Sequence, residues 1–281
     1  MLRDIAVRKE KLCSIEVSSK RKFNMDVLKN IQFSFVSVIW IGKYTKDPPI
    51  IEPLSMAREL IQRGYPVLLH LPSRCFTIVE ASKCLNYAKK IGVKNLLIVR
   101  GGGPEAVDEP SCYDFPYPAD FISHIKKKFG DSFEFAVAGY PMLHPESTTM
   151  EDEMKCIKAK CEAGAKYIVT QSVFSYPIIK EYVEQLRIHN IKAKVIPGIY
   201  ILSSFADYEI LQRLCKIPND DEVAAFINEH RNNDEAISKY ARDSAKTLIL
   251  SILDNKEILP PHVFTMNEFD IIKSFLQFLY K

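Results

Sequence analysis

Short apolar segments alternate with longer amphipathic segments along the chain. The apolar segments, which predict β-strands, cover residues 12–17, 34–40, 66–71, 94–99, 133–139, 167–171, 193–196 and 262–266. The amphipathic segments, which predict helices, cover residues 25–31, 52–63, 78–91, 119–129, 150–163, 178–189, 205–215, 220–230, 235–253 and 268–280. Several of the strand segments are continuously apolar, which is typical of parallel strands buried on both faces. The pattern therefore predicts an α/β protein with a parallel sheet.

The number of strands favours a closed sheet. Eight strands can close into a (β/α)₈ TIM-like barrel, which leaves no free sheet edge. We find no linker and no internal repeat, so we expect one domain over residues 1–281. An open, doubly wound sheet is the alternative. The glycine turn after the fourth strand, residues 101–103, does not follow the G-x-G-x-x-G pattern and does not favour a Rossmann-type phosphate site.

Composition narrows the possible functions. The chain is 47% hydrophobic and 26% charged, with 38 basic and 35 acidic residues, so we expect a folded core and no nucleic-acid partner. Seven cysteines without a C-x-x-C pair suggest neither a zinc site nor a disulfide framework, and we expect no metal. No apolar run reaches the ~20 residues of a transmembrane helix. The weakly basic start lacks the apolar core of a secretory signal, so we expect an intracellular protein, cytoplasmic or mitochondrial.

Polar residues recur at or just after the ends of the apolar strands. They are Glu16, His70, Arg100, Tyr140, His144 and Gln171. In a parallel barrel the carboxyl ends of all strands meet at one rim, which is where such barrels carry their active sites. The sequence therefore predicts a functional site at this rim.

The residue types suggest specific roles. Burial would raise the pKa of Glu16 and make it a general acid, although an ion pair with Lys20 or Arg100 is the alternative. The planar fork of Arg100 suits a diphosphate or a carboxylate. Gln171 must find partners for its amide, and a substrate could supply both of them. For Tyr140 and its neighbours, a proline-rich loop that satisfies only local backbone groups is the alternative.

Several segments resemble the methylenetetrahydrofolate reductase family. They are FVSVIW, HLPSRC, KNLLIVRGG, GYPMLHPES, KAKCEAGAKYIVTQ and VIPGIYILSSF, and the resemblance extends from about Glu16 to the last helix. It implies a (β/α)₈ barrel with bound flavin adenine dinucleotide. It also implies an activity of one-carbon metabolism, in which hydride passes from NADH or NADPH through the flavin to reduce methylenetetrahydrofolate to methyltetrahydrofolate.

The resemblance assigns roles to individual positions. Those that match flavin contacts are His70, Arg100, Gly101, Tyr140, His144 and Lys160. Glu16 matches the acid that protonates the folate nitrogen, Gln171 matches a contact to folate and nicotinamide, and Phe205 matches an aromatic residue that packs on those ligands. The regulatory domain that eukaryotic members carry after the barrel is not expected, and the protein is expected to form a homo-oligomer or to join a larger complex.

Some positions depart from the family pattern. Gly102 replaces an Asp after strand four, Glu268 replaces an Arg after strand eight, Ser172 replaces a Phe, and the residues 39–42 replace Thr-Tyr-Gly-Ala. The changes are concentrated where folate and nicotinamide would bind. Two hypotheses follow: a flavin-dependent reductase, or a catalytically degenerate member that serves as a structural or regulatory subunit, for example in a mitochondrial assembly, with or without flavin.

Overall fold

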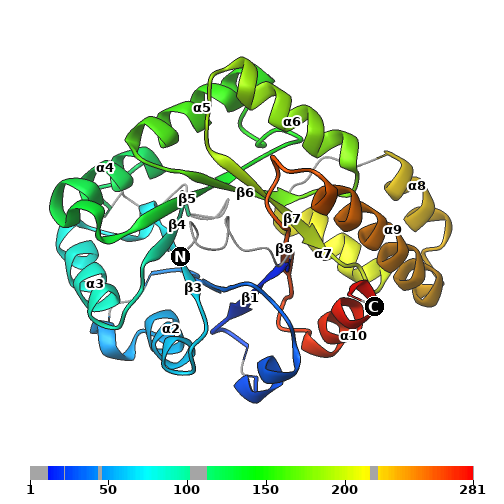
Figure 1. Cartoon of the computed structure of the whole chain (residues 1–281), viewed down its shortest axis with the longest axis horizontal. Helices are drawn as coiled ribbons and strands as arrows, with labels where there is room; N and C mark the ends of the chain where they lie inside the picture. Colours follow the sequence, from blue (N-terminus) through cyan, green and yellow to red (C-terminus); the bar gives the residue numbers. More distant parts are fainter. Residues whose placement is uncertain (1–11, 22, 44–45, 102–112, 216–220, 281) are drawn as a thin grey trace.

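Eight parallel strands close into a barrel in the order β1 to β8 (Figure 1). The computed structural model describes residues 12–21, 23–43, 46–101, 113–215 and 221–280. The strands are β1 Ser14–Ser18, β2 Val36–Ile39, β3 Val67–Pro72, β4 Asn95–Val99, β5 Glu134–Gly139, β6 Tyr167–Ser172, β7 Lys194–Tyr200 and β8 His262–Phe264. The predicted (β/α)₈ barrel is confirmed, and the open doubly wound alternative is excluded.

Helices surround the barrel on its outer face (Figure 1). They are α2 Glu52–Gln62, α3 Ile78–Lys90, α4 Pro118–Phe129, α5 Met150–Ala163, α6 Tyr176–Ile188, α7 Phe205–Cys215, α8 Asp221–Glu229, α9 Asp234–Asp254 and α10 Phe269–Leu279. Local sequence explains several of their ends. Thr77 and Glu80 form a capping box at the start of α3, and Gly164 ends α5 with a φ of 133° that glycine adopts without strain.

The structure differs from the predicted elements at three places. The helix predicted over residues 25–31 is a 3₁₀ helix, Met25–Asn30. Strand β7 continues to Tyr200, well beyond the predicted end, because the residues after Ile196 still pair with β6 and β8. Strand β8 is shorter than predicted because Met266 and Asn267 have positive φ values of 48° and 63°, which do not fit an extended strand.

Alternate residues of each strand face the helices or the barrel interior. The helix-facing residues belong to one large apolar core, whereas a smaller cluster fills the interior: Phe35, Leu68, Leu97, Ala136, Tyr167, Val169 and Ile196. Beside it lies a polar group of three residues. The two ring nitrogens of His262 lie 2.8 Å from Ser14 Oγ and 3.1 Å from Ser37 Oγ. Burial lowers the pKa of His262 to about 3, so its ring is neutral at physiological pH.

Helices α7, α8 and α9 enclose a separate apolar cluster beside the ends of β6 and β7 (Figure 1). Residues such as Leu202, Ile227 and Ile237 are buried in it. A cavity of about 20 Å³ lies between this cluster and β7, which is about the volume of one water molecule. The cavity is therefore too small for a cofactor. In the described parts of the chain, none of the helices has the length and apolar character required to cross a bilayer.

The first strand and the last helix are joined by direct contacts. The backbone N–H of Cys13, which is buried, donates a 2.7 Å hydrogen bond to the hydroxyl oxygen of Tyr280. The rings of Phe23 and Phe269 lie 4.6 Å apart, and the 3₁₀ helix Met25–Asn30 lies near α10 (Figure 1). These contacts tie together segments that are far apart in the sequence.

We predict that Tyr280→Phe lowers the free energy of unfolding by about 1–3 kcal/mol, because it leaves the buried Cys13 N–H without its acceptor. Chemical denaturation measures the change. Tyr65→Phe is the matched control, since this hydroxyl makes no hydrogen bond within the described residues, and we expect a change within about 0.5 kcal/mol. Equal losses in both variants would show that the Tyr280 hydrogen bond does not stabilise the barrel.

Candidate functional site

Glu16 is buried near the carboxyl end of β1, on the face that points into the barrel. The residue is 4% exposed, and burial raises the pKa of the Glu16 carboxyl group to about 7. Hydrogen bonding from the backbone of Met266 and Thr265 offsets part of this increase. The carboxyl group can therefore hold a proton near neutral pH and release it to a neighbour. Arg100, one of the ion-pair partners considered from the sequence, is paired elsewhere.

Arg100 follows β4, and the loop after β3 fixes its backbone. Its carbonyl oxygen accepts hydrogen bonds from Arg74 N–H at 2.9 Å and from Ser73 Oγ at 3.2 Å. The next residue, Gly101, has a φ of 71°, and a Cβ at this position would lie only 2.4 Å from Pro72 Cβ. Only glycine fits here, so Gly101 lets the end of β4 pack directly against Pro72 at the end of β3.

The Arg100 guanidinium forms a two-point ion pair with Glu146, at 2.5 Å and 2.6 Å. The pair raises the pKa of Arg100 and lowers the pKa of Glu146. Sequence analysis did not identify Glu146 as part of the site. Its place in the loop after β5, two residues beyond His144, is the signal that could have found it. Arginine has five N–H donors, so this contact leaves others for an anionic ligand.

Tyr140 and His144 lie in the loop after β5 with their rings edge to face, 4.6 Å apart between centroids. His144 Nδ1 accepts a 3.0 Å hydrogen bond from Glu146 N–H. Burial lowers the pKa of His144, and the positive charge of Arg100 lowers it further. This ring therefore does satisfy a local backbone group, as the alternative interpretation of the loop required, and it also lies beside Arg100.

Helix α5 contributes a half-buried Lys160 close to this loop. Its ammonium group donates a 3.1 Å hydrogen bond to the carbonyl oxygen of Ala138, and burial lowers its pKa. Glu153, two turns earlier on α5, is 2% exposed, and burial raises its pKa. Glu153 was not identified from the sequence, although its spacing of seven residues from Lys160 places both on one helix face.

His70, on β3, has an unsatisfied polar atom. Its Nε2 is buried and makes no hydrogen bond within the described residues. Burial lowers its pKa to about 4, so the ring is neutral. An unpaired buried group of this kind costs about 1–3 kcal/mol, which a ligand atom could recover. This free ring nitrogen and the cations Arg100 and Lys160 together fit a flavin with a diphosphate.

Gln171 lies near the end of β6, and Phe205 is the first residue of α7, which follows β7. The pairing of β6 with β7 changes register between Val169 and Ser172, so Gln171 lies at an irregular point of the strand. Its Oε1 accepts a 3.3 Å hydrogen bond from Ser172 N–H. Phe205 is half-buried at the start of α7, and its N–H donates to Asp234 Oδ1 at 3.0 Å.

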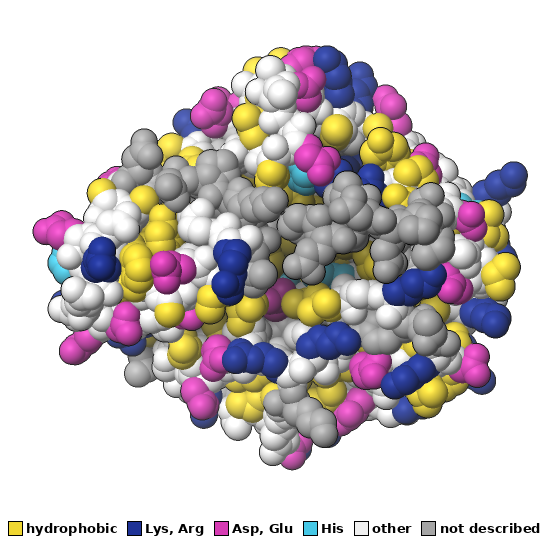
Figure 2. All heavy atoms as spheres, turned by 180° about the vertical axis from the view of Figure 1, so that it is seen from behind, with side chains coloured by type: hydrophobic (Ala, Val, Ile, Leu, Met, Phe, Trp, Pro, Cys, Tyr) yellow, Lys and Arg dark blue, Asp and Glu magenta, His cyan; other side chains and the backbone are white. Residues whose placement is uncertain are grey.

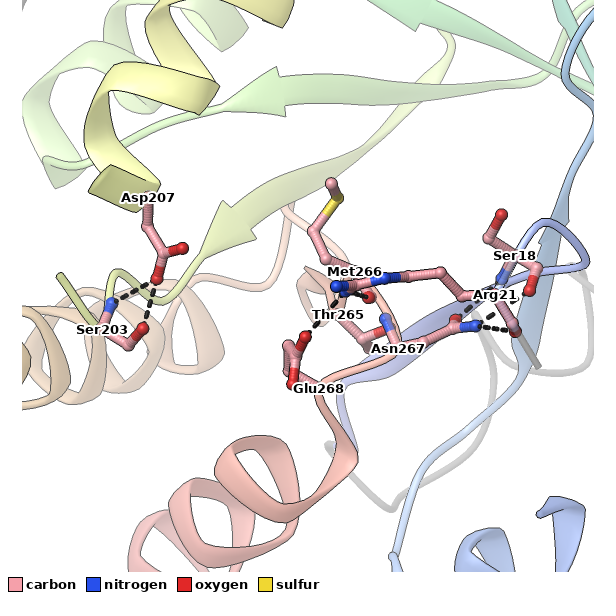
Figure 3. A network of polar contacts seen from close by, with 8 residues as sticks. All are labelled: Ser18, Arg21, Ser203, Asp207, Thr265, Met266, Asn267 and Glu268. Atoms are coloured by element: carbon pink, nitrogen blue, oxygen red, sulfur yellow. Dashed lines mark hydrogen bonds and ion pairs between the residues drawn. The ribbon is translucent and has the colours of Figure 1, made fainter. Parts of the chain in front are cut away.

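The turn after β8 carries Glu268, which pairs with Arg21 at 2.7 Å (Figure 3). Arg21 also donates to the carbonyl oxygen of Met266 at 2.8 Å. The two ion-pair side chains are 60% and 53% exposed, so solvent screens their interaction. In the same view Ser203 and Asp207 form a separate hydrogen-bonded pair at the start of α7. Gly102, the other charge change noted in the sequence, lies outside the described residues.

Charges of both signs are mixed over the face shown in Figure 2, with acidic and histidine side chains near its middle and single Lys and Arg side chains spread around them. In the described part of the chain, no three His, Cys, Asp or Glu side chains are arranged to hold a metal ion. The strand ends bring the acid Glu16 and the neutral His70 to the same end of the barrel as Arg100 and Gln171. The arrangement can donate a proton and bind an anionic ligand.

The fold and the site place this protein among the (β/α)₈ barrels that carry a buried acid and cationic loop residues at one end of the barrel. The family model for methylenetetrahydrofolate reductase matches residues 16–279. The chain therefore belongs to the methylenetetrahydrofolate reductase family.

Relatives in this family are longer than the chain. It is 30% identical over 242 residues to methylenetetrahydrofolate reductase 2 of Schizosaccharomyces pombe, covering 81% of this chain and 37% of that protein. It is 28% identical over 254 residues to methylenetetrahydrofolate reductase (NADH) 1 of Arabidopsis thaliana, covering 86% and 42%. A probable methylenetetrahydrofolate reductase (NADPH) of Caenorhabditis elegans is 25% identical, covering 87% and 37%. The chain thus spans about two fifths of the length of these relatives.

One solved structure has a TM-score of 0.61 and 14% sequence identity, and covers 99% of both chains. It is a protein from Clostridium thermocellum that binds two copies of 5-methyl-5,6,7,8-tetrahydrofolic acid. At this level of identity the likeness supports the barrel fold and says nothing about the ligand of this chain.

The raised pKa of Glu16 predicts a pH-dependent stability. Between pH 4.5 and about 7 the Glu16 carboxyl group of the folded protein keeps a proton that the unfolded chain releases, so the contribution of Glu16 to the free energy of unfolding falls as the pH rises through this range. This fall is up to about 3 kcal/mol. The buried His70 and His262, whose pKa values are lowered, change stability in the opposite direction in wild type and variant alike. We therefore expect the free energy of unfolding of Glu16→Gln, relative to that of wild type, to rise between pH 4.5 and 7, as measured by denaturant unfolding at several pH values.

The matched control is Glu184→Gln on the exposed face of α6, which should keep the wild-type dependence. If the difference in the free energy of unfolding between Glu16→Gln and wild type stayed the same from pH 4.5 to 7, the Glu16 carboxyl group would have an ordinary pKa.

Proposed function

We propose that this barrel is a flavin-dependent oxidoreductase that reduces methylenetetrahydrofolate to methyltetrahydrofolate with electrons from NADH or NADPH. The observation that carries the proposal is the protonated acid at the end of β1 in a member of this family: Glu16 is buried, and its pKa of about 7 suits proton donation near neutral pH. Relatives of the chain are named both as NADH and as NADPH enzymes, so they favour neither donor.

The loop cluster suits a flavin adenine dinucleotide. Arg100 and Lys160 would supply positive charge to the diphosphate. His70 would use its free Nε2 on a polar atom of the cofactor, and Tyr140 with His144 would form the side of the binding site. Bound flavin would accept hydride from the nicotinamide and pass it to the folate.

The chain's own contribution to chemistry is proton transfer and orientation. When the bond between the methylene carbon and a folate nitrogen breaks, the nitrogen must gain a proton and the carbon must gain a hydride. Glu16 would supply the proton, because its burial favours the neutral acid until a basic nitrogen is nearby. Gln171 would hydrogen-bond the pterin or the nicotinamide with its amide, and Phe205 would pack on the same ligands.

The role of Arg100 predicts that Arg100→Ala weakens flavin retention about tenfold or more, because a charge-assisted contact to the diphosphate is lost. Titration of the apoprotein with flavin adenine dinucleotide measures the change. Arg58→Ala is the control, since its guanidinium contacts Tyr87 in the outer helix layer at 3.3 Å. An affinity of Arg100→Ala equal to that of Arg58→Ala would remove Arg100 from the site.

The role of Glu16 predicts that Glu16→Gln abolishes methyltetrahydrofolate formation while flavin binding persists, since glutamine keeps the shape but cannot donate the proton. Steady-state assays with methylenetetrahydrofolate and each nicotinamide cofactor measure this. Glu268, which pairs with Arg21, places a carboxylate where an anionic folate tail would bind, so we expect turnover below that of typical relatives. Folded, flavin-loaded wild type without any turnover would instead favour the structural or regulatory subunit.

A further inference from the structure

The junction between β1 and β8, where the barrel closes, has very little strand pairing. Only Ser14 with His262 and Ile15 with Val263 are paired. Beyond them, the side chain of Asn267 takes the place of a strand residue (Figure 3). Its Oδ1 accepts a 2.9 Å hydrogen bond from Ser18 N–H, and its Nδ2 donates a 2.9 Å hydrogen bond to the carbonyl oxygen of Ser18. A carboxamide offers the same donor and acceptor as a peptide group, so it completes the closure of the barrel.

The same residue shapes the turn after β8. Glu268 N–H donates to the carbonyl oxygen of Thr265 at 2.8 Å, and the two central residues, Met266 and Asn267, have φ values of 48° and 63°. This is a turn of the type I′ kind, in which asparagine is favoured and methionine is not. A second donor bond, from Asn267 Nδ2 to the carbonyl oxygen of Arg21 at 2.8 Å, ties the turn to the loop after β1. The turn is therefore held from outside, because Met266 disfavours its conformation.

The inner side of this turn contacts Glu16. The Thr265 hydroxyl donates to the backbone carbonyl oxygen of Glu16 at 2.8 Å and accepts from Asn267 N–H at 3.0 Å. The backbone of Met266 and of Thr265 also lowers the pKa of the Glu16 carboxyl group, against the larger effect of burial. The side chain of Asn267 thus holds the peptide groups that surround the acid, although it has no recorded contact with the acid itself.

We infer that Asn267 is a positioning residue for Glu16: its carboxamide completes the β1–β8 closure and holds the Thr265–Met266 backbone against the carboxyl group. The inference rests on the proposed role of Glu16 as the proton donor. It adds a residue that acts through the turn rather than on the substrate.

Other charged or titratable groups near Glu16 do not replace the effect of the turn on its pKa. The titratable side chains on the nearby strands are His262 on β8, which pairs with β1, and His70 on β3, and their pKa values are lowered so that both are uncharged at neutral pH. On the adjoining loops, Arg21 and Glu268 neutralise each other. Hydrogen bonding from the turn is the influence recorded to oppose the desolvation of Glu16, so its loss should raise the pKa.

The test is Asn267→Gly in the full chain. Glycine adopts the left-handed backbone of the turn readily, so the change removes the side-chain clamp and leaves the backbone conformation accessible. The readout is the titration of the Glu16 carboxyl carbon by NMR with ¹³C-labelled glutamate, with the signal assigned by its absence in Glu16→Gln. We expect the pKa of Glu16 to rise by about half a unit or more, and the pH profile of any turnover to shift in the same direction.

Asn190→Gly is the matched control, because Asn190 also has a left-handed φ of 58° but lies after α6, far from Glu16 in the fold. It should leave the Glu16 titration unchanged. An unchanged titration in Asn267→Gly as well would overturn the inference. If Asn267→Gly does not fold, Asn267→Ser is used instead, because it removes both donor bonds but keeps a short polar side chain. A higher pKa of Glu16 in Asn267→Ser would support the inference, and an unchanged pKa would overturn it.

The titration needs no turnover, so the two proposals can fail separately. A Glu16 pKa that responds to Asn267→Gly in a protein without reductase activity would reject the proposed function and keep the positioning contact. Reductase activity that depends on Glu16, together with a Glu16 titration that Asn267→Gly leaves unchanged, would support the proposed function and reject the positioning contact.

Discussion

A carboxylic acid buried where the first and last strands meet is the constraint on which this structure depends. Burying the carboxylate of Glu16 costs free energy, and no cation of the described residues is recorded as its partner. The group responds by keeping its proton, with a pKa of about 7, and the backbone of the turn after β8 opposes part of this rise. Because only two residue pairs join β1 to β8, the side chain of Asn267 completes the junction there. The same turn after β8 therefore closes the barrel and positions Glu16.

The charged residues at the mouth are largely paired with each other. Arg21 pairs with Glu268, and Arg100 pairs with Glu146. Exposed ion pairs contribute roughly 0–1 kcal/mol, so an anionic ligand can displace a carboxylate at small cost. The Arg100 pair is therefore compatible with a diphosphate. The charge change at Glu268, where the family pattern has an Arg, has a different effect. Its carboxylate, once displaced from Arg21, would remain beside the anionic tail of a folate and repel it. Flavin binding and folate binding are thus expected to be affected unequally in this chain.

The sequence predicted the barrel well because alternating apolar and amphipathic segments leave few topologies. It also predicted that Glu16 and His70 lie at the same end of the barrel, since parallel strands share their direction. It could not predict the pairing of Arg100 with Glu146 or the clamp of Asn267, because both join segments far apart in the sequence. The end of β8 was misplaced for a similar reason. Nothing in the pattern of apolar residues indicates that Met266 adopts a left-handed backbone, which tertiary contacts impose.

The most informative measurement is whether bound flavin, once reduced, is reoxidised by methylenetetrahydrofolate. The purified full chain, supplied with flavin adenine dinucleotide, would be reduced under anaerobic conditions by NADH or NADPH and then mixed with methylenetetrahydrofolate. If the barrel is a flavin-dependent reductase, the flavin absorption disappears on reduction and returns after the folate is added, with methyltetrahydrofolate as the product. A protein that binds no flavin, or whose reduced flavin stays reduced in the presence of the folate, would contradict the proposed function.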